Sequence, residues 1–150
     1  MTSRIIELSR QIAAPPAKVW RCWTDPALLP QWFGPQGFTC KTTEIDLREG
    51  GLWRFDMIGP DGTVWKNRHR YLRMEPTHLL QFLLDGDDDG EAAAEVEMTL
   101  SATPGGTLIC YQMQFPTAEA CQAALGFGAK ELGQTTLDKL ADLAEGLPPA

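Results

Sequence analysis

Long hydrophobic runs are missing from this chain of 150 residues. The longest unbroken apolar stretch is Leu108–Tyr111, whereas a membrane-spanning helix needs about 20 apolar residues. The first seven residues contain no apolar segment of signal-peptide length. These absences predict a soluble protein of the cytoplasm.

Positive charge is scarce as well. The chain has 13 Lys and Arg against 20 Asp and Glu, which gives a formal net charge of -7. Affinity for nucleic acid or for an anionic membrane depends on a positive field, so we expect neither as a partner.

Residues that bind metals and cofactors are few. The four cysteines, at positions 22, 40, 110 and 121, form neither the close pairs of a zinc site nor a dense disulfide framework, so we interpret them as reduced, mostly buried thiols. The sequence has no Gly-rich phosphate loop, no Gly-x-Ser-x-Gly elbow and no Cys-x-x-Cys or His-Glu-x-x-His motif. We therefore expect no cofactor and no metal ion.

The apolar residues that are present, 43% of the chain, suffice for one real core. A folded chain of this size buries roughly 70% of the surface that its unfolded form exposes. No repeat, low-complexity tract or linker divides the sequence, which predicts a single domain over residues 1–150.

The N-terminal part predicts a strand and two short helices. Apolar residues alternate over residues 4–12, which indicates a half-buried strand. Pro16 then suits a first helical turn, and this helix should end before Asp25. A second short helix is predicted over residues 26–32.

Strand patterns dominate the middle of the chain. Short turns rich in Gly, Pro and Asp separate six segments, which favours antiparallel pairing of neighbours. The predicted strands are about 40–47, 52–58, 63–74, 79–84, 92–102 and 107–115.

Beyond Pro116 the apolar period changes to three or four residues, which predicts a long C-terminal helix. Thr117 is a plausible cap. Glycines at positions 126, 128 and 133 predict either a short helix followed by a break or an irregular start. The apolar stripe is Ala129, Leu132, Thr136, Leu140, Leu143 and Leu147.

These elements predict an α+β fold, in which a curved antiparallel sheet of about seven strands is covered on its concave face by the long helix. Alternation places aromatic and flexible methionine side chains on that face, where they can either fill a core or line an adaptable apolar cavity. The expected inward residues are Trp53, Phe55, Met57, Trp65, His69, Tyr71, Leu80, Phe82, Leu84, Val96, Met98, Leu100, Ile109, Tyr111, Met113 and Phe115.

Nearly the whole chain resembles the single-domain bacterial homologues of the activator of the heat-shock-protein-90 ATPase, within the START-like (SRPBCC) helix-grip superfamily. The resemblance is strongest in the segments 12–20 (IAAPPAKVW), 23–26 (WTDP), 31–38 (QWFGPQGF) and 46–51 (DLREGG). It implies a helix-grip fold that frequently encloses a hydrophobic cavity between the sheet and the long helix. Relatives commonly begin the last helix with a Gly-Trp pair, but here Gly133 precedes Gln134, which would change the lining or depth of a cavity.

Fold alone does not imply a reaction, because members of this superfamily bind lipids or hormones, cyclise polyketides or assist a chaperone. His69 could orient a polar ligand atom together with Tyr71, although a local hydrogen bond or a position at a solvent edge is favoured. For Asp46 and Arg48 a salt bridge that braces the adjacent turn is favoured over ligand binding.

Two charged segments have favoured structural interpretations. Lys66, Arg68 and Arg70 alternate on one strand face, which indicates a solvated outer face, with a docking patch for an acidic partner as the alternative. Residues 85–91 (DGDDDGE) open like a calcium loop, but position twelve is Val96 and the flanks are strands, so a charged hairpin tip is favoured.

The leading functional hypothesis is non-catalytic binding of a small hydrophobic or aromatic molecule under the last helix. The alternatives are a chaperone-regulating module and an enzyme that acts on an enclosed aromatic or polyketide-like substrate, for which His69 or Asp46 would have to open into the cavity. An exposed strand edge would also allow a homodimer. The predicted ligand-binding residues are Trp32, Phe38, Trp53, Phe55, Met57, Trp65, His69, Tyr71, Phe82, Met98 and Tyr111.

Overall fold

The computed structural model describes residues 4–148; residues 1–3 and 149–150 of the predicted domain lie outside this part. Seven strands and four helices follow one another in the predicted order. The elements are β1 (Ile5–Ile12), α1 (Pro16–Thr24), α2 (Leu29–Trp32), β2 (Thr39–Asp46), β3 (Leu52–Ile58), β4 (Val64–Glu75), β5 (Leu79–Asp85), β6 (Ala94–Thr103), β7 (Gly106–Gln114), α3 (Ala118–Gly126) and α4 (Ala129–Gly146).

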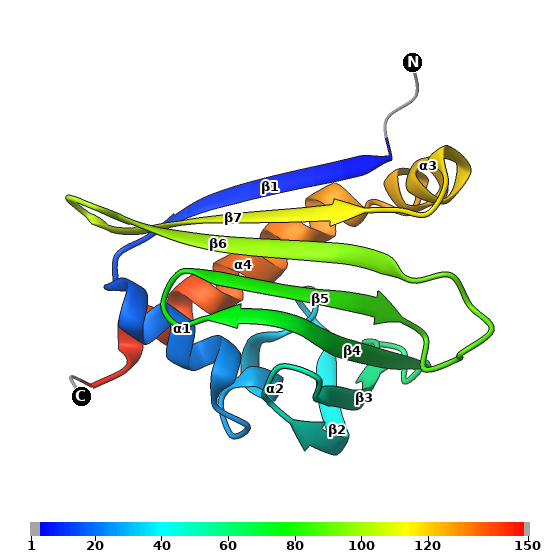
Figure 1. The fold of residues 1–150 in the computed structure, drawn as a ribbon, viewed down its shortest axis with the longest axis horizontal. Coiled ribbons are helices and arrows are strands. Elements are labelled where there is room, and N and C mark those ends of the chain that lie inside the picture. The colour runs from blue at the N-terminus through cyan, green and yellow to red at the C-terminus, as the bar shows by residue number, and fades with distance from the viewer. Residues whose placement is uncertain (1–3, 149–150) are drawn as a thin grey trace.

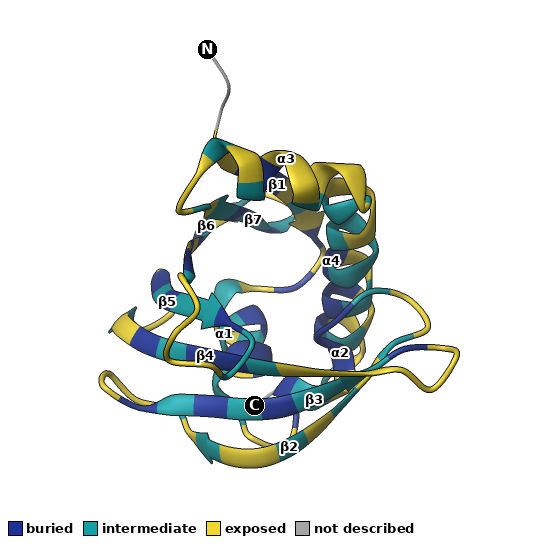
Figure 2. Ribbon diagram, turned by 90° about the vertical axis from the view of Figure 1, so that its right-hand side faces the viewer, coloured by how far each residue is buried: buried dark blue, intermediate teal, exposed yellow. Residues whose placement is uncertain are grey.

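The strands form one antiparallel sheet in the order β1-β7-β6-β5-β4-β3-β2. Strands β2 to β7 are a meander, and β1 returns to pair with β7 (Figure 1). The sheet bends into an arc, and α4 crosses its open side (Figure 2). The α+β helix-grip arrangement predicted from the sequence is therefore confirmed.

Local sequence explains where the early helices begin and end. Pro16 occupies the first turn of α1, where its missing N–H costs no hydrogen bond, and Pro15 precedes it in an extended conformation. Asp25 ends α1 in the extended region, ahead of Pro26. The inner face of α1 buries Val19, Cys22 and Trp23. The second helix is shorter than predicted, a single turn.

The break predicted early in the C-terminal helix is also present. Thr117 caps α3, because its Oγ1 accepts a hydrogen bond of 3.0 Å from the Ala120 N–H. Gly128 has a φ of +82° and separates α3 from α4. The buried face of α4 is Leu137, Leu140, Ala141 and Ala144.

The thiols agree with their predicted state: all four are free, Cys22 and Cys121 buried and the other two half-buried.

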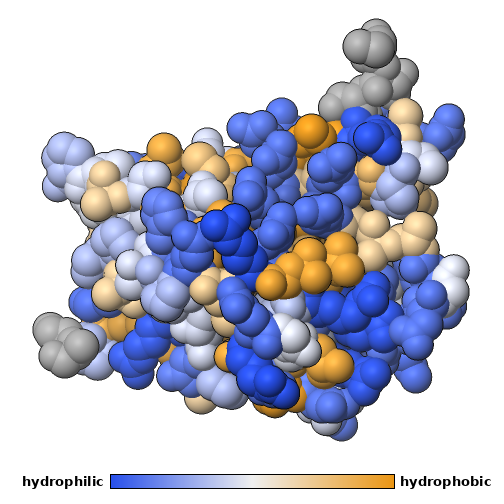
Figure 3. Space-filling view, in the orientation of Figure 1, coloured by the Kyte–Doolittle hydropathy of each residue, from blue (hydrophilic) through white to orange (hydrophobic). Residues whose placement is uncertain are grey.

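The outer face of the sheet is mostly hydrophilic (Figure 3), but its arginines are not all solvated. The side chain of Arg68 is only 5% exposed, so the prediction of a solvated stripe is wrong at this position. Its guanidinium donates two hydrogen bonds to Asp85, from Nε to Oδ1 at 3.0 Å and from Nη2 to Oδ2 at 2.8 Å. Arg70 also reaches Asp85, at 3.0 Å.

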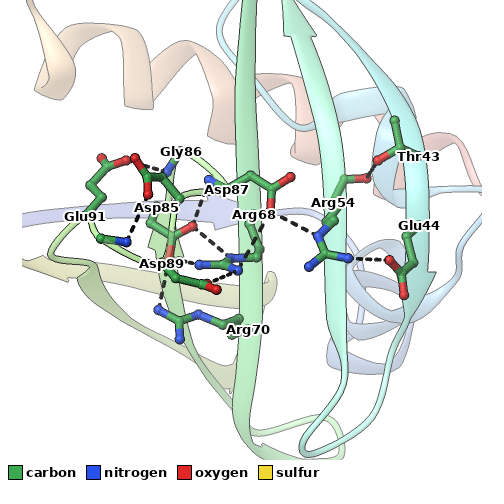
Figure 4. Close-up of polar contacts among 12 residues, drawn as sticks. Thr43, Glu44, Arg54, Arg68, Arg70, Asp85, Gly86, Asp87, Asp89 and Glu91 are labelled. Carbon is green, nitrogen blue, oxygen red and sulfur yellow. Dashed lines mark hydrogen bonds and ion pairs between the residues drawn. The ribbon is translucent and has the colours of Figure 1, made fainter.

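The acidic segment 85–91 lies at the tip of the β5–β6 hairpin, as predicted, and it folds back over these arginines (Figure 4). Asp89 lies 2.7 Å from Arg68, and Asp87 lies 3.0 Å from Arg54. Burial acts to raise the pKa of Asp85, but the hydrogen bonds from Arg68 and from the Asp87 N–H outweigh it, so this pKa lies below its ordinary value. Asp85, Asp87 and Asp89 of the acidic loop are thus paired with Arg54, Arg68 and Arg70.

Candidate functional site

An apolar cavity of about 240 Å³ lies between α4 and the concave face of the sheet. Side chains from four strands, three helices and the loop after α2 surround it. Of the described residues that line it, none is charged: Leu8, Trp23, Trp32, Phe33, Gly34, Pro35, Met57, Leu84, Tyr111, Met113, Ala129, Leu132, Gly133, Thr136 and Leu137.

Aromatic rings form one wall of this cavity. Trp23 meets Trp32 edge-to-face with ring centroids 4.6 Å apart, and it stacks on Tyr111 at 6.0 Å with an interplanar angle of 22°. Phe33 packs edge-on against both indoles. Aromatic pairs prefer such offset and perpendicular geometries.

The polar atoms of the wall differ in whether they have a partner. The indole Nε1 of Trp32 donates a hydrogen bond of 2.9 Å to the carbonyl oxygen of Cys22. The indole Nε1 of Trp23 is buried and makes no hydrogen bond with any described residue. Burial raises the pKa of Tyr111 far above its ordinary value, so its phenol stays neutral.

Helix α4 fixes the loop that closes one side of the cavity. The Nζ of Lys139 donates hydrogen bonds to the carbonyl oxygens of Gly34, Pro35 and Phe38, at 3.1, 3.3 and 3.2 Å. The N–H of Gln36 donates to Thr135 Oγ1 at 3.1 Å. Burial lowers the pKa of Lys139. Gly34 and Pro35 therefore line the cavity from a loop that α4 holds.

Three of the predicted ligand-binding residues line the cavity: Trp32, Met57 and Tyr111. Six others are buried in the hydrophobic core beyond it, none more than 2% exposed: Trp53, Phe55, His69, Tyr71, Phe82 and Met98. The two interpretations of the inward face, a packed core and a lined cavity, therefore apply to different parts of the same face.

Trp65 and Phe38 lie elsewhere. The prediction that Trp65 points into the interior is wrong, because this residue is 56% exposed. Phe38 and Trp65 border a shallow surface depression beside Pro60. Alternation along a strand determines which face a side chain occupies, but it does not say whether another element covers that position.

His69 lies on the inward face of the sheet, as alternation predicted, but its surroundings differ from those that we favoured. It is completely buried and makes neither the local hydrogen bond nor the solvent contact that we favoured. Aromatic rings surround it, with Phe82 stacked at 4.2 Å and Phe33 edge-on at 4.9 Å. Burial lowers its pKa to about 3, against an opposing effect of the Asp85 charge, so the imidazole is neutral near pH 7.

The groups required for the enzymatic alternative do not line the cavity. His69 lies behind its wall, and Asp46 is half-exposed and forms the predicted salt bridge with Arg48 at 2.7 Å. Within residues 4–148, no three His, Cys, Asp or Glu side chains are grouped so that they could hold a metal ion. Among the described helices, none has the length and hydropathy to cross a bilayer.

Sequence reasoning missed most of the lining that lies outside the strands. Trp23 and Phe33 come from α1 and from the loop after α2, and Gly133 and Thr136 come from α4. The sequence did contain a signal for Gly133, because a glycine inside an amphipathic helix indicates that another segment packs closely against the helix backbone. An added Cβ there would lie 2.5 Å from Leu8 Cδ1.

A profile described as "Activator of Hsp90 ATPase homolog 1-like protein" matches residues 13–145. The chain belongs to this family. The match spans every element that lines the cavity except β1 and therefore confirms the resemblance seen in the sequence. A search of curated proteins finds no match.

Solved bacterial structures share the fold of this family member. A protein from Chromobacterium violaceum is 26% identical with a TM-score of 0.81, over 93% of this chain and 96% of that one. A protein from Mycobacterium smegmatis is 25% identical with a TM-score of 0.84, over 94% and 90%. The AHSA1 protein from Silicibacter pomeroyi is 22% identical with a TM-score of 0.74, over 92% and 95%.

Proposed function

We propose that this protein binds one small hydrophobic or aromatic molecule, without catalysis, in the cavity between the sheet and α4. The observation that carries the proposal is the cavity itself, about 240 Å³ in volume with no charged residue among its described lining. A packed interior normally has few voids larger than a water molecule, and the side chains that line an apolar space of this size lack contacts that a ligand would supply.

The volume limits the size of the ligand. An engineered apolar cavity of about 150 Å³ binds benzene, and drug-sized ligands occupy pockets of about 300–1,000 Å³. A space of about 240 Å³ suits one or two fused rings. The aromatic wall of Trp23, Trp32 and Tyr111 offers flat faces to such a ligand, and the unpartnered Nε1 of Trp23 offers one donor.

Binding of 2-methylnaphthalene to the purified protein tests the proposal. We expect an increase in the melting temperature, because a ligand at about 100 times its Kd stabilises the folded state by about 2.7 kcal/mol. We also expect a change in the fluorescence of the tryptophans in the wall. Absence of both signals, together with no bound molecule in native mass spectrometry, would refute small-molecule binding.

A pair of variants locates the bound probe. Ala129→Trp places an indole in the lining at the start of α4 and should abolish binding of 2-methylnaphthalene. Ala123→Trp makes the same substitution at an exposed position of α3 outside the lining and should leave binding unchanged. Equal binding by the two variants would place the ligand elsewhere. Chaperone binding and homodimer formation stay predictions from the sequence.

A further inference from the structure

Polar atoms without partners are concentrated behind the wall of the cavity. Both ring nitrogens of His69, the hydroxyl of Tyr71 and the Nε1 of Trp23 are buried and make no hydrogen bond with any described residue. More than about 90% of buried polar groups in folded proteins have a partner. Each orphaned group has lost its hydrogen bonds to water without replacement, so a cluster of them needs an explanation.

These atoms belong to one cluster around Phe82. The ring of Phe82 stacks on His69 with centroids 4.2 Å apart. It also lies 5.9 Å from the ring of Tyr71 and 6.2 Å from that of Trp23. Trp23 lines the cavity, whereas His69 and Tyr71 do not. The cluster therefore extends from the cavity wall into the core.

Two residues separate His69 from the cavity. Phe33 lines the cavity on one side and contacts His69 edge-on at 4.9 Å on the other. Leu84 also lines the cavity and is the partner of His69 in the pairing of β4 with β5. Phe33 belongs to the loop after α2, and the next residue, Gly34, has a φ of +100°. His69 therefore adjoins two residues that line the cavity.

We propose that, on ligand binding, the ring of Phe33 moves aside and that His69 and Tyr71 form hydrogen bonds with the hydroxyl group of an aromatic ligand. This inference rests on the proposed function and specifies the ligand class for the same cavity. A neutral imidazole has one donor and one acceptor nitrogen, and a phenol both donates and accepts. A ligand hydroxyl therefore complements the orphaned groups, and its aromatic ring remains in the apolar cavity.

Matched probes test the ligand class. 2-Naphthol and 2-methylnaphthalene have nearly the same shape but differ by a hydroxyl in place of a methyl group. The variant Tyr71→Phe should weaken binding of 2-naphthol about 10-fold, the equivalent of one hydrogen bond. Binding of 2-methylnaphthalene should not change. We compare the ratio of the two affinities in the variant with the same ratio in the wild type. The two probes differ in hydration, but this difference is the same for both proteins and drops out of the comparison.

The chain provides its own control, because Tyr71 and Tyr111 are its two tyrosines. Tyr111 lines the main cavity, so Tyr111→Phe should leave the ratio as in the wild type. An unchanged ratio in Tyr71→Phe, or a loss of preference in Tyr111→Phe instead, would overturn the inference while leaving the proposed function intact. If neither probe binds the wild type, the proposed function fails and the inference fails with it.

A second readout needs no variant. The ring nitrogens of His69 in the labelled wild-type protein should change their chemical shifts when 2-naphthol binds, because a hydrogen bond forms at one of them. The same signals should move much less with 2-methylnaphthalene. Equal shifts with the two bound probes would contradict the hydrogen bond.

Discussion

Arg68 of β4 and Asp85 of β5 face each other across the paired strands and form a two-point ion pair with side-chain exposures of only 5% and 0%. Removal of one partner from a buried pair leaves an uncompensated charge, which costs far more than the intact pair contributes. This geometry makes Arg68 a critical residue for stability, although its alternation with Lys66 and Arg70 in the sequence predicts a solvated face.

The variant Arg68→Met should lower the free energy of unfolding by about 3 kcal/mol, because Asp85 loses its two-point partner and keeps only the contact with Arg70 and the hydrogen bond from the Asp87 N–H. Urea unfolding at pH 7 measures the change. The control is Arg48→Met, which breaks an exposed pair with Asp46 and should leave stability almost unchanged. Equal effects of the two substitutions would contradict the importance of burial.

A dependence of stability on pH should arise from His69. Its pKa is about 3 in the folded protein and about 6.5 in an unfolded chain, so below pH 6.5 the unfolded state binds more protons. Stability is therefore complete above about pH 6.5 and declines as the pH falls towards 3. Between pH 7 and pH 5 the loss from this residue is about 2 kcal/mol.

Urea unfolding of His69→Leu at pH 7 and pH 5 isolates that contribution, because the variant should lose the slope. His78→Gln changes the other histidine, which lies in an exposed turn, and should keep the wild-type slope. The carboxylate of Asp85, whose pKa is lowered, affects stability only at lower pH. The same decline in His69→Leu as in the wild type would show that other groups cause it.

Alanine substitutions at two glycines should distinguish the effect of helix propensity on stability from the effect of cavity shape on ligand binding. Gly126→Ala adds a methyl group with no atom within 4 Å and should stabilise the protein by about 0.5–1 kcal/mol. Gly133→Ala places its Cβ 2.5 Å from Leu8 Cδ1, so Leu8 must shift. We expect a smaller gain in thermal stability and several-fold weaker binding of 2-methylnaphthalene; wild-type affinity would contradict a role for this contact in shaping the cavity.

Lys139 should control the mobility of the loop beside the cavity. Lys139→Met removes the hydrogen bonds that its ammonium group donates to Gly34, Pro35 and Phe38, which should cost about 2 kcal/mol. Amides of residues 34–38 should exchange hydrogen faster, as measured by mass spectrometry. Lys130→Met alters an exposed lysine of the same helix and should not accelerate exchange there. Unchanged exchange in Lys139→Met would show that other contacts hold the loop.

The fold could be predicted because local patterns and turn chemistry agree over most of the chain. Pro16 marks the start of α1, and Thr117 and Gly128 mark the division between α3 and α4. The predicted strand limits agree with the observed ones to within two residues. Each of these features depends on a few neighbouring residues, which is the range over which sequence reasoning works well.

The cavity could be predicted only in part, because it depends on packing between distant segments. Alternation correctly placed Met57 and Tyr111 on the concave face, but it could not distinguish them from Trp53 and Phe55, which fill the core on the same face. The burial of Arg68 required knowledge that the acidic loop folds back over β4. No local sequence pattern predicts against which part of the sheet a loop of this length packs.

The return of β1 to the far edge of the meander has a consequence for how the protein is made. Ile5 pairs with Gln114 and Ile12 with Thr107. During synthesis β1 can therefore pair only after β7 has been translated. Such pairing between distant segments slows folding and leaves apolar strand faces exposed in the meantime. The cavity, which needs β1, β7 and α4 together, can form only after α4 has been translated.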